Sequence, residues 1–132
     1  MKSDLIAPCG MNCAVCVAYF GYNMNGSKRK IACPGCRPRN KGCAFLKKHC
    51  GLLANNEIDF CYECKAYPCQ RLLKLDERYR KRYNMSMVKN LNSIRDHGMK
   101  EFLNMQSEKY RCSKCGGTIC VHTNRCYSCS SF

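Results

Sequence analysis

The sequence contains no tryptophan, and its hydrophobic fraction of 45% includes 15 cysteines. The mean hydropathy is negative. A chain of 132 residues that buried only its aliphatic and remaining aromatic side chains would form a small core. We therefore expect the fold to depend on another source of stability.

Residues that commonly serve in acid–base catalysis are also scarce, since aspartate and glutamate total nine and histidine three. The sequence contains no GxxxxGK[ST] phosphate loop, no GxSxG nucleophile turn and no HExxH zinc-protease motif. Most of the acidic residues fall inside expected helices. The sequence therefore favours a non-catalytic protein over an enzyme, and we infer no small-molecule substrate from it.

No apolar run approaches the roughly 18 residues that a membrane span needs. The longest run, from Cys13 to Phe20, is followed by Gly21 and Asn23. The first residues, MKSDLIAPCG, have neither the apolar region nor the cleavage site of a secretory signal. We expect a soluble cytoplasmic protein without a membrane partner, in a reducing compartment where disulfides do not persist.

The cysteines are arranged in pairs with CxxC spacing. A CxxC turn directs two thiolates at one ion, and two such turns complete a tetrahedron around Zn²⁺. A thioredoxin-type redox CxxC would instead require one pair in a βαβ context. The spacing therefore predicts bound zinc, with three ions expected. The pairs are Cys13/Cys16, Cys33/Cys36, Cys61/Cys64, Cys112/Cys115 and Cys126/Cys129.

The C-terminal stretch CSKCGGTICVHTNRCYSC predicts a zinc ribbon. Gly116 and Gly117 follow the first pair and suit a tight turn that folds back over the metal. Ile119 and Val121 alternate with polar positions as a short strand would. The expected ligands are Cys112, Cys115, Cys126 and Cys129.

Two further residues of this stretch, Cys120 and His122, stay open as substitute ligands or neighbours of the metal. For His122 alone we expect a surface position.

Ten further cysteines occupy the N-terminal half, and single cysteines offer no spacing rule for sharing them between ions. We favour one ion held by Cys13, Cys16, Cys33 and Cys36. A second ion would be held by Cys43, Cys50, Cys61 and Cys64. Cys9 and Cys69 are competitors for either site.

Iron–sulfur chemistry is the alternative for this half. Cys9, Cys13 and Cys16 have the CxxxCxxC spacing of radical-SAM enzymes, but that chemistry needs a βα barrel of about 200 residues, and no βα repeat occurs here. We interpret this match as coincidental. A simpler iron–sulfur redox protein stays open because thiolates also bind [4Fe–4S] clusters, although the spacings differ from the bacterial ferredoxin run.

Four sequence blocks resemble the domain of unknown function 3795 family, an uncharacterised group of prokaryotic cysteine-rich proteins. The blocks are APCGMNCAVCVAYF, CPGCR, CAFLKKHC and FCYECKAYPCQRLLKL. The resemblance covers residues 5–80, and the ribbon resembles a C-terminal extension found in some members. It implies zinc binding, and it supplies no activity or substrate.

Between the cysteine-rich ends, apolar residues recur at helical spacing. Leu72, Leu75, Tyr79 and Tyr83 predict a helix over residues 69–83. Ser86 is placed to cap a second helix that Gly98 ends, and a third helix runs to Tyr110. We expect these apolar faces to form core contacts that dock the ribbon.

The formal net charge is +14 with neutral thiols. Three Zn(Cys)₄ sites of charge −2 would leave about +8. Such a surface could neutralise nucleic-acid phosphates, although pairing of Asp76 with Arg80 and of Glu77 with Lys81 would make the same helix an ordinary solvated face. The candidate nucleic-acid contacts are Arg71, Lys74, Arg78 and Arg82.

Together these patterns predict a small α+β, metal-stabilised protein. It would comprise a zinc module (residues 1–68), a helical connector (69–110) and a zinc ribbon (111–132). The expected role is a non-catalytic binding module whose partner is nucleic acid or another protein.

Overall fold

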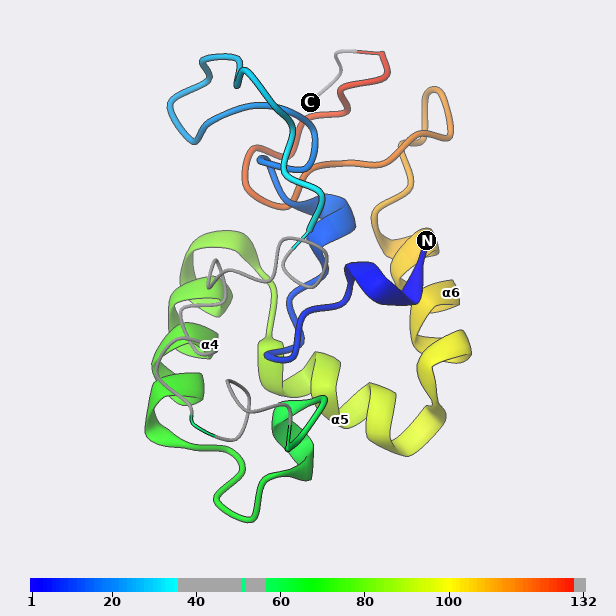
Figure 1. Cartoon of the computed structure of the whole chain (residues 1–132). Helices are drawn as coiled ribbons and strands as arrows, with labels where there is room; N and C mark the ends of the chain where they lie inside the picture. The colour runs from blue at the N-terminus through cyan, green and yellow to red at the C-terminus, as the bar shows by residue number, and fades with distance from the viewer. Residues whose placement is uncertain (36–50, 52–56, 130–132) are drawn as a thin grey trace.

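The computed structural model describes residues 1–35, 51 and 57–129 (Figure 1). Its α-helices are α4 (Gln70–Tyr83), α5 (Met87–His97) and α6 (Met99–Lys109). Its short 3-10 helices are η1 (Ser3–Leu5), η2 (Cys13–Val15) and η3 (Cys61–Glu63). Three predicted metal ligands, Cys36, Cys43 and Cys50, lie outside the described residues.

The ends of the three α-helices follow from local sequence signals. The Ser86 hydroxyl accepts a hydrogen bond from the Lys89 amide at 3.1 Å, which caps α5. Asn84 at the end of α4 has a left-handed φ of 52°, and Gly98 at the end of α5 has a φ of 86°. The three helices expected from the sequence are therefore confirmed. Within the described residues, no helix combines the length and apolar character that a membrane crossing requires.

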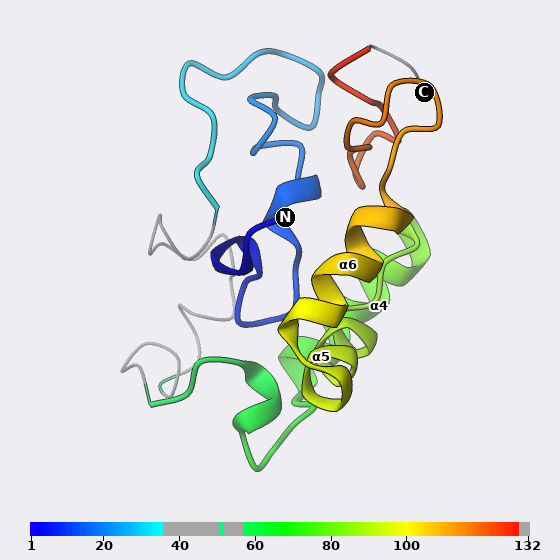
Figure 2. The same ribbon diagram turned by 90° about the vertical axis from the view of Figure 1, so that its right-hand side faces the viewer.

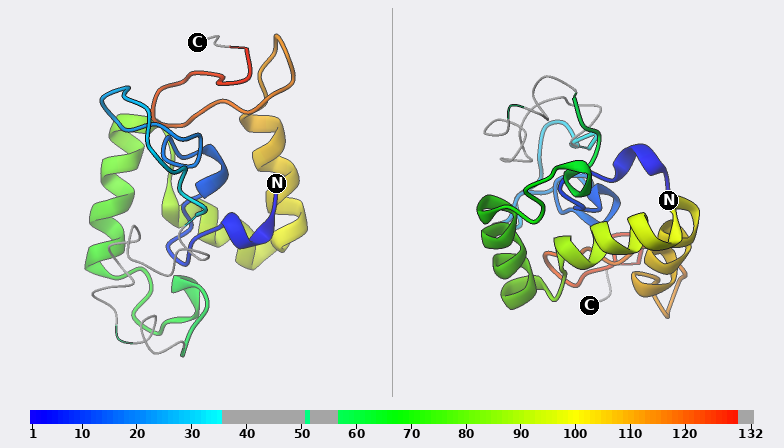
Figure 3. Two further views of the ribbon diagram at one scale, coloured as in Figure 1. Left: turned by 45° about the horizontal axis from the view of Figure 1, so that its top comes forward. Right: turned by 90° about the horizontal axis from the view of Figure 1, so that it is seen from below.

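The three helices form a U-shaped layer. In Figure 1, α4 and α6 stand on either side of the molecule, and α5 crosses between their lower ends. The N-terminal segment (blue) lies between α4 and α6 in this view and on one face of the helices in Figure 2. The view from below in Figure 3 shows the same order. The N-terminal segment thus packs against one face of the helical layer.

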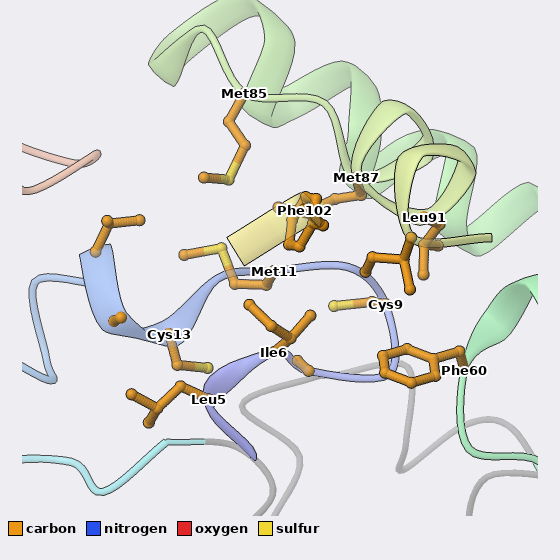
Figure 4. Packing of buried hydrophobic residues seen from close by; sticks show 14 of the residues in the cluster. Leu5, Ile6, Cys9, Met11, Cys13, Phe60, Met85, Met87, Leu91 and Phe102 are labelled. Atoms are coloured by element: carbon orange, nitrogen blue, oxygen red, sulfur yellow. The ribbon is translucent and has the colours of Figure 1, made fainter. Parts of the chain in front are cut away.

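A single buried cluster joins this segment to the helices (Figure 4). Val121 of the C-terminal stretch also belongs to the cluster, so residues from all three predicted segments contribute to one core. The division at residues 68 and 110 stays a prediction. Fully buried members include Ile6, Val15, Leu72, Met85, Met87, Leu91 and Phe102.

Gly10 lies in close contact with α5. Its φ is +89°, and a Cβ there would lie 2.7 Å from the Met87 carbonyl oxygen and 2.9 Å from Leu91 Cγ. The Asn90 side-chain amide donates to the Gly10 carbonyl at 2.9 Å. Only glycine can adopt this conformation without strain at so short a distance.

Extended structure is sparse among the described residues. Backbone pairing between segments appears as isolated antiparallel bridges, not as strands of a sheet. Over the described residues the structure thus has three α-helices and little strand, and the expected α+β class is not confirmed. The bridges join Ile6 to Asn12, Tyr22 to Lys28, Arg111 to Thr118, and Ile119 to Cys126.

Candidate metal centre

The first cysteine pair of the C-terminal stretch lies in a closed turn. The Gly116 amide donates to the Cys112 carbonyl at 2.9 Å, and the Cys112 amide donates to the Gly117 carbonyl at 2.7 Å. Gly116 has a φ of +75°, as the turn requires. Gly117 is needed for space instead, because a Cβ there would lie 2.9 Å from Ser128 Oγ and 3.2 Å from Cys115 Sγ.

A second turn presents the other pair. Asn124 adopts a left-handed φ of 58°, and its amide donates to the Cys120 carbonyl at 2.9 Å. The Cys120 amide donates to the Arg125 carbonyl at 2.8 Å, and Ile119 bridges to Cys126. These bonds fold the chain back so that the second pair faces the first.

The four sulfurs meet in one cluster. The Sγ atoms of Cys112, Cys115, Cys126 and Cys129 all lie within 4.8 Å of one another. Cys112 and Cys129 are 3.7 Å apart, and Cys115 and Cys126 are 3.5 Å apart. A tetrahedral ion with sulfur ligands at about 2.3 Å requires sulfur–sulfur edges of about 3.8 Å, whereas a disulfide requires about 2.05 Å. The donor set therefore fits a thiolate-bound metal ion.

Burial alternates within the cluster, since Cys112 and Cys126 are buried and Cys115 and Cys129 are exposed. The Gly117 amide, 3.3 Å from Cys115 Sγ, lowers the pKa of Cys115, but the neighbouring thiols outweigh it and raise that pKa to about 12. The Cys129 amide lowers the pKa of Cys126. The neighbouring thiols therefore oppose the ionisation of Cys115, and a bound cation would favour its thiolate form.

His122 connects the C-terminal stretch to the rest of the protein. Its Nδ1 accepts a hydrogen bond from the Val17 amide at 3.1 Å, and its Nε2 lies 3.0 Å from the Tyr79 hydroxyl. Because Nδ1 is an acceptor, Nε2 carries the proton and donates to Tyr79. The edge of the ring also contacts Tyr83, and burial lowers the pKa of His122 to about 4. The expected surface position of His122 was wrong.

Cys120 is fully buried and does not belong to the four-sulfur cluster. The adjacent amide of Val121 donates to the Val15 carbonyl at 2.9 Å, which holds the stretch against the turn that carries Cys13 and Cys16. Cys120 is therefore placed as a core residue of the docking contact.

The described N-terminal cysteines are distributed differently. Cys9, Cys13, Cys33 and Cys61 are buried, and Cys16, Cys64 and Cys69 are partly buried. The Cys33 amide donates to the carbonyl of Ala18, close to Cys16, and the Cys61 amide donates to the carbonyl of Pro8, next to Cys9. Among the residues that the structure describes, the C-terminal cluster is the only group of three or more potential metal ligands. The two N-terminal sites stay predictions.

The candidate nucleic-acid contacts, Arg71, Lys74, Arg78 and Arg82, are exposed along α4. Asp76 pairs with Arg80 at 2.7 Å, and Glu77 pairs with Lys81 at 2.8 Å, so the expected ion pairs also form. The four exposed cations form no ion pair within the described part of the chain.

Sequence reasoning missed an aromatic stack beside the metal cluster. Tyr22 and Tyr127 stack with ring centroids 4.6 Å apart and an angle of 12°, and Phe20 lies 5.2 Å from Tyr127. Tyr127 stands between Cys126 and Cys129, whereas Phe20 and Tyr22 follow Cys16. Aromatic residues beside both cysteine pairs were the available signal, but their pairing depends on the fold.

The family described as "Protein of unknown function (DUF3795)" matches residues 5–74. The match covers more than half of the 132-residue chain and includes all ten N-terminal cysteines. The four-sulfur cluster lies outside it. No curated protein and no solved structure matches the chain. On the strength of the family match, this cysteine-rich chain belongs to the DUF3795 family.

Proposed function

We propose that the protein is a non-catalytic zinc-binding module that binds nucleic acid. The observation that carries the metal assignment is the cluster of four cysteine sulfurs within 4.8 Å. Four thiolates are the ligand set of structural zinc sites, and they leave no coordination position for water or substrate. When bound, zinc would cross-link the two turns, so its contribution is to hold the C-terminal stretch together.

The nucleic-acid assignment rests on charge and exposure. The formal charge is +14, and one Zn(Cys)₄ site lowers it by only two. Arg71, Lys74, Arg78 and Arg82 are spaced by three, four and four residues, so they line one side of α4. Cations in such a row can contact successive phosphates of a nucleic-acid backbone.

Elemental analysis of protein purified under reducing, anaerobic conditions tests the metal assignment. We expect zinc in the native chain and one zinc fewer in Cys115→Ser or Cys129→Ser. Ser113→Ala, in the same turn but without a ligand atom, is the matched control and should keep the native zinc content. Iron and sulfide in a brown protein, or an unchanged zinc content in both cysteine variants, would contradict the assignment.

Affinity measured against salt concentration tests nucleic-acid binding. Each phosphate contact contributes about 0.7 to 0.9 to the log–log salt slope. Replacing Arg71, Lys74, Arg78 and Arg82 by glutamine should therefore reduce the slope by about three. The control replaces two cations of the same helix, Arg80 and Lys81, which already pair with acidic residues and should therefore change the slope much less. A flat salt slope for the native chain, with binding to a protein instead, would contradict this function.

A further inference from the structure

A basic loop, residues 19–31, projects at the same end of the molecule as the C-terminal stretch (Figures 1 and 2). Its backbone is closed by internal hydrogen bonds. The Asn23 amide donates to the Ser27 carbonyl at 2.8 Å, and the Arg29 amide donates to the Gly21 carbonyl at 2.8 Å. The Asn25 side chain accepts from the Ser27 amide at 3.0 Å. The loop is therefore a defined structure that can present side chains in fixed positions.

The stack of Tyr22 on Tyr127 anchors the basic loop to the metal-binding turns. Phe20 extends the stack on one side, and the Arg125 guanidinium lies 5.3 Å from the centre of the Tyr127 ring. Because Tyr127 stands between two cysteines of the cluster, the position of the loop depends on the turn that holds those cysteines.

The loop carries concentrated positive charge. Lys28, Arg29 and Lys30 line an open hollow of 440 Å³ together with Asn23 and Ile31, and none of these described lining residues carries a carboxylate. The sequence contains no acidic residue between Asp4 and Glu57. A phosphate entering the hollow would therefore meet three cations and no opposing local charge.

Large apolar side chains are exposed on the same loop. Tyr19, Met24 and Ile31 are 36%, 59% and 79% exposed. They make up three of the six large hydrophobic side chains that are exposed among the described residues. Ile31 also lines the hollow, and exposed apolar side chains next to cations commonly mark an interaction site.

Cations interleaved with exposed aromatic and apolar side chains fit one chemical class best. Single-stranded nucleic acid presents phosphates to the cations and unpaired base faces to the apolar side chains. A duplex keeps its base faces stacked inside and offers only the phosphates.

We propose that the basic loop binds single-stranded nucleic acid, with Lys28, Arg29 and Lys30 at the phosphates and Tyr19, Met24 and Ile31 against the bases. This inference rests on the proposed nucleic-acid function and adds the strand preference and the surface. Through the Tyr22–Tyr127 stack, single-strand binding also becomes dependent on an intact metal-binding turn.

Fluorescence anisotropy with a labelled 20-nucleotide oligothymidine, and with a mixed-sequence DNA duplex of equal length, tests the proposal. Native protein should prefer the single strand. Lys28→Gln/Lys30→Gln should reduce the single-strand salt slope by about 1.4, since each single-strand phosphate contact contributes about 0.7. Tyr19→Ala should weaken single-strand binding about fivefold or more through lost stacking, and duplex binding little. Lys89→Gln/Lys100→Gln, exposed on α5 and α6, is the control of equal charge and should leave both unchanged.

These measurements distinguish failure of the loop assignment from failure of nucleic-acid binding as a whole. Equal affinity for strand and duplex, or equal losses in the loop and control variants, would overturn the assignment to the loop while leaving nucleic-acid binding intact. Native protein that binds neither probe would overturn the proposed function together with this inference. Tyr127→Leu, which keeps all four cysteines, should retain zinc and lose the preference for the single strand; a preserved preference would overturn the anchoring role of the stack.

Discussion

The two cysteine-rich regions of this protein use the same residue in different surroundings. At the C-terminus, four cysteines gather their sulfurs in one cluster, in which two cysteines are exposed and two are buried. In the N-terminal region, Cys9, Cys13 and Cys61 are part of the buried hydrophobic cluster (Figure 4). Cysteine behaves as a small hydrophobic residue when buried and as a ligand when its thiolate is stabilised.

A high cysteine count alone therefore does not show which cysteines bind metal. The C-terminal stretch has few apolar side chains, so sulfur–metal bonds would provide the stability that a hydrophobic core provides elsewhere. The N-terminal segment packs against three helices and shares a core with them. We therefore expect the two regions to respond differently to metal removal and to core substitutions.

The largest effect should come from chelation under reducing conditions. Structural zinc can contribute about 10 kcal/mol to folding, so its removal should release the C-terminal turns. In amide hydrogen exchange, the protons of Gly116 and Cys120 should exchange about a hundredfold faster or more, whereas the Gly10 proton should keep most of its protection. Equal loss of protection in both regions would contradict the expected difference in their dependence on metal.

The next effect concerns the N-terminal core. Gly10→Ala should destabilise the protein by about 3 kcal/mol, because a positive φ is combined with a clash against the Met87 carbonyl. Gly26→Ala, with a φ of +92° but nothing within 4 Å of its Cβ, is the matched control and should cost about 1 kcal/mol. Urea unfolding of both variants measures the difference, and similar losses would show that the close approach to α5 is unimportant.

A smaller effect is expected at Asp76, which joins α4 to α5. Burial alone would raise the pKa of Asp76, but hydrogen bonds from Ser86, Val88 and Arg80 lower it below its ordinary value. Asp76→Asn should cost about 2 kcal/mol at neutral pH. The carboxylate contribution is present above about pH 4 and is lost as the pH falls through the lowered pKa.

Thermal unfolding of Asp76→Asn between pH 7 and pH 3 would measure this difference from the native chain. Glu77→Gln, one residue along the same helix, removes an exposed pair and should leave stability unchanged. A native chain no more stable than Asp76→Asn at pH 7 would contradict the role of the buried carboxylate.

The smallest effect is expected at the contact between the two regions. The pKa of His122 is about 4, against an ordinary value of 6.5, so the unfolded chain takes up a proton first as the pH falls. Stability should therefore fall between pH 6.5 and pH 4, by about 1 kcal/mol at pH 5 after allowance for partial exposure. His122→Phe should remove this pH dependence, and His97→Phe, at an exposed position, should retain it. An identical pH profile for native protein and His122→Phe would contradict a docking role that needs the neutral imidazole.

Features encoded within a few residues were predictable from the sequence. The caps at Ser86 and Gly98 and the CxxC pairs of the C-terminal cluster act over less than one turn or hairpin, so spacing alone located them. Three other contacts join residues that are far apart in the chain. They are the approach of Gly10 to α5, the hydrogen bond from Val17 to His122, and the Tyr22–Tyr127 stack. No local pattern records such contacts. The expected α+β class is not confirmed, because the alternating residues around Ile119 form isolated bridges instead of a strand of a sheet.

The bond from Val17 to His122 spans 105 residues, and it has a consequence for how the protein is made. A ribosome adds about 5 to 20 residues per second, so the N-terminal turn is synthesised several seconds before His122, to which it binds in the folded chain. During that interval Cys13 and Cys16 lack the C-terminal contacts that the folded chain makes with this turn. The thiols of the turn are therefore more open to reaction while the chain is being made than after it has folded.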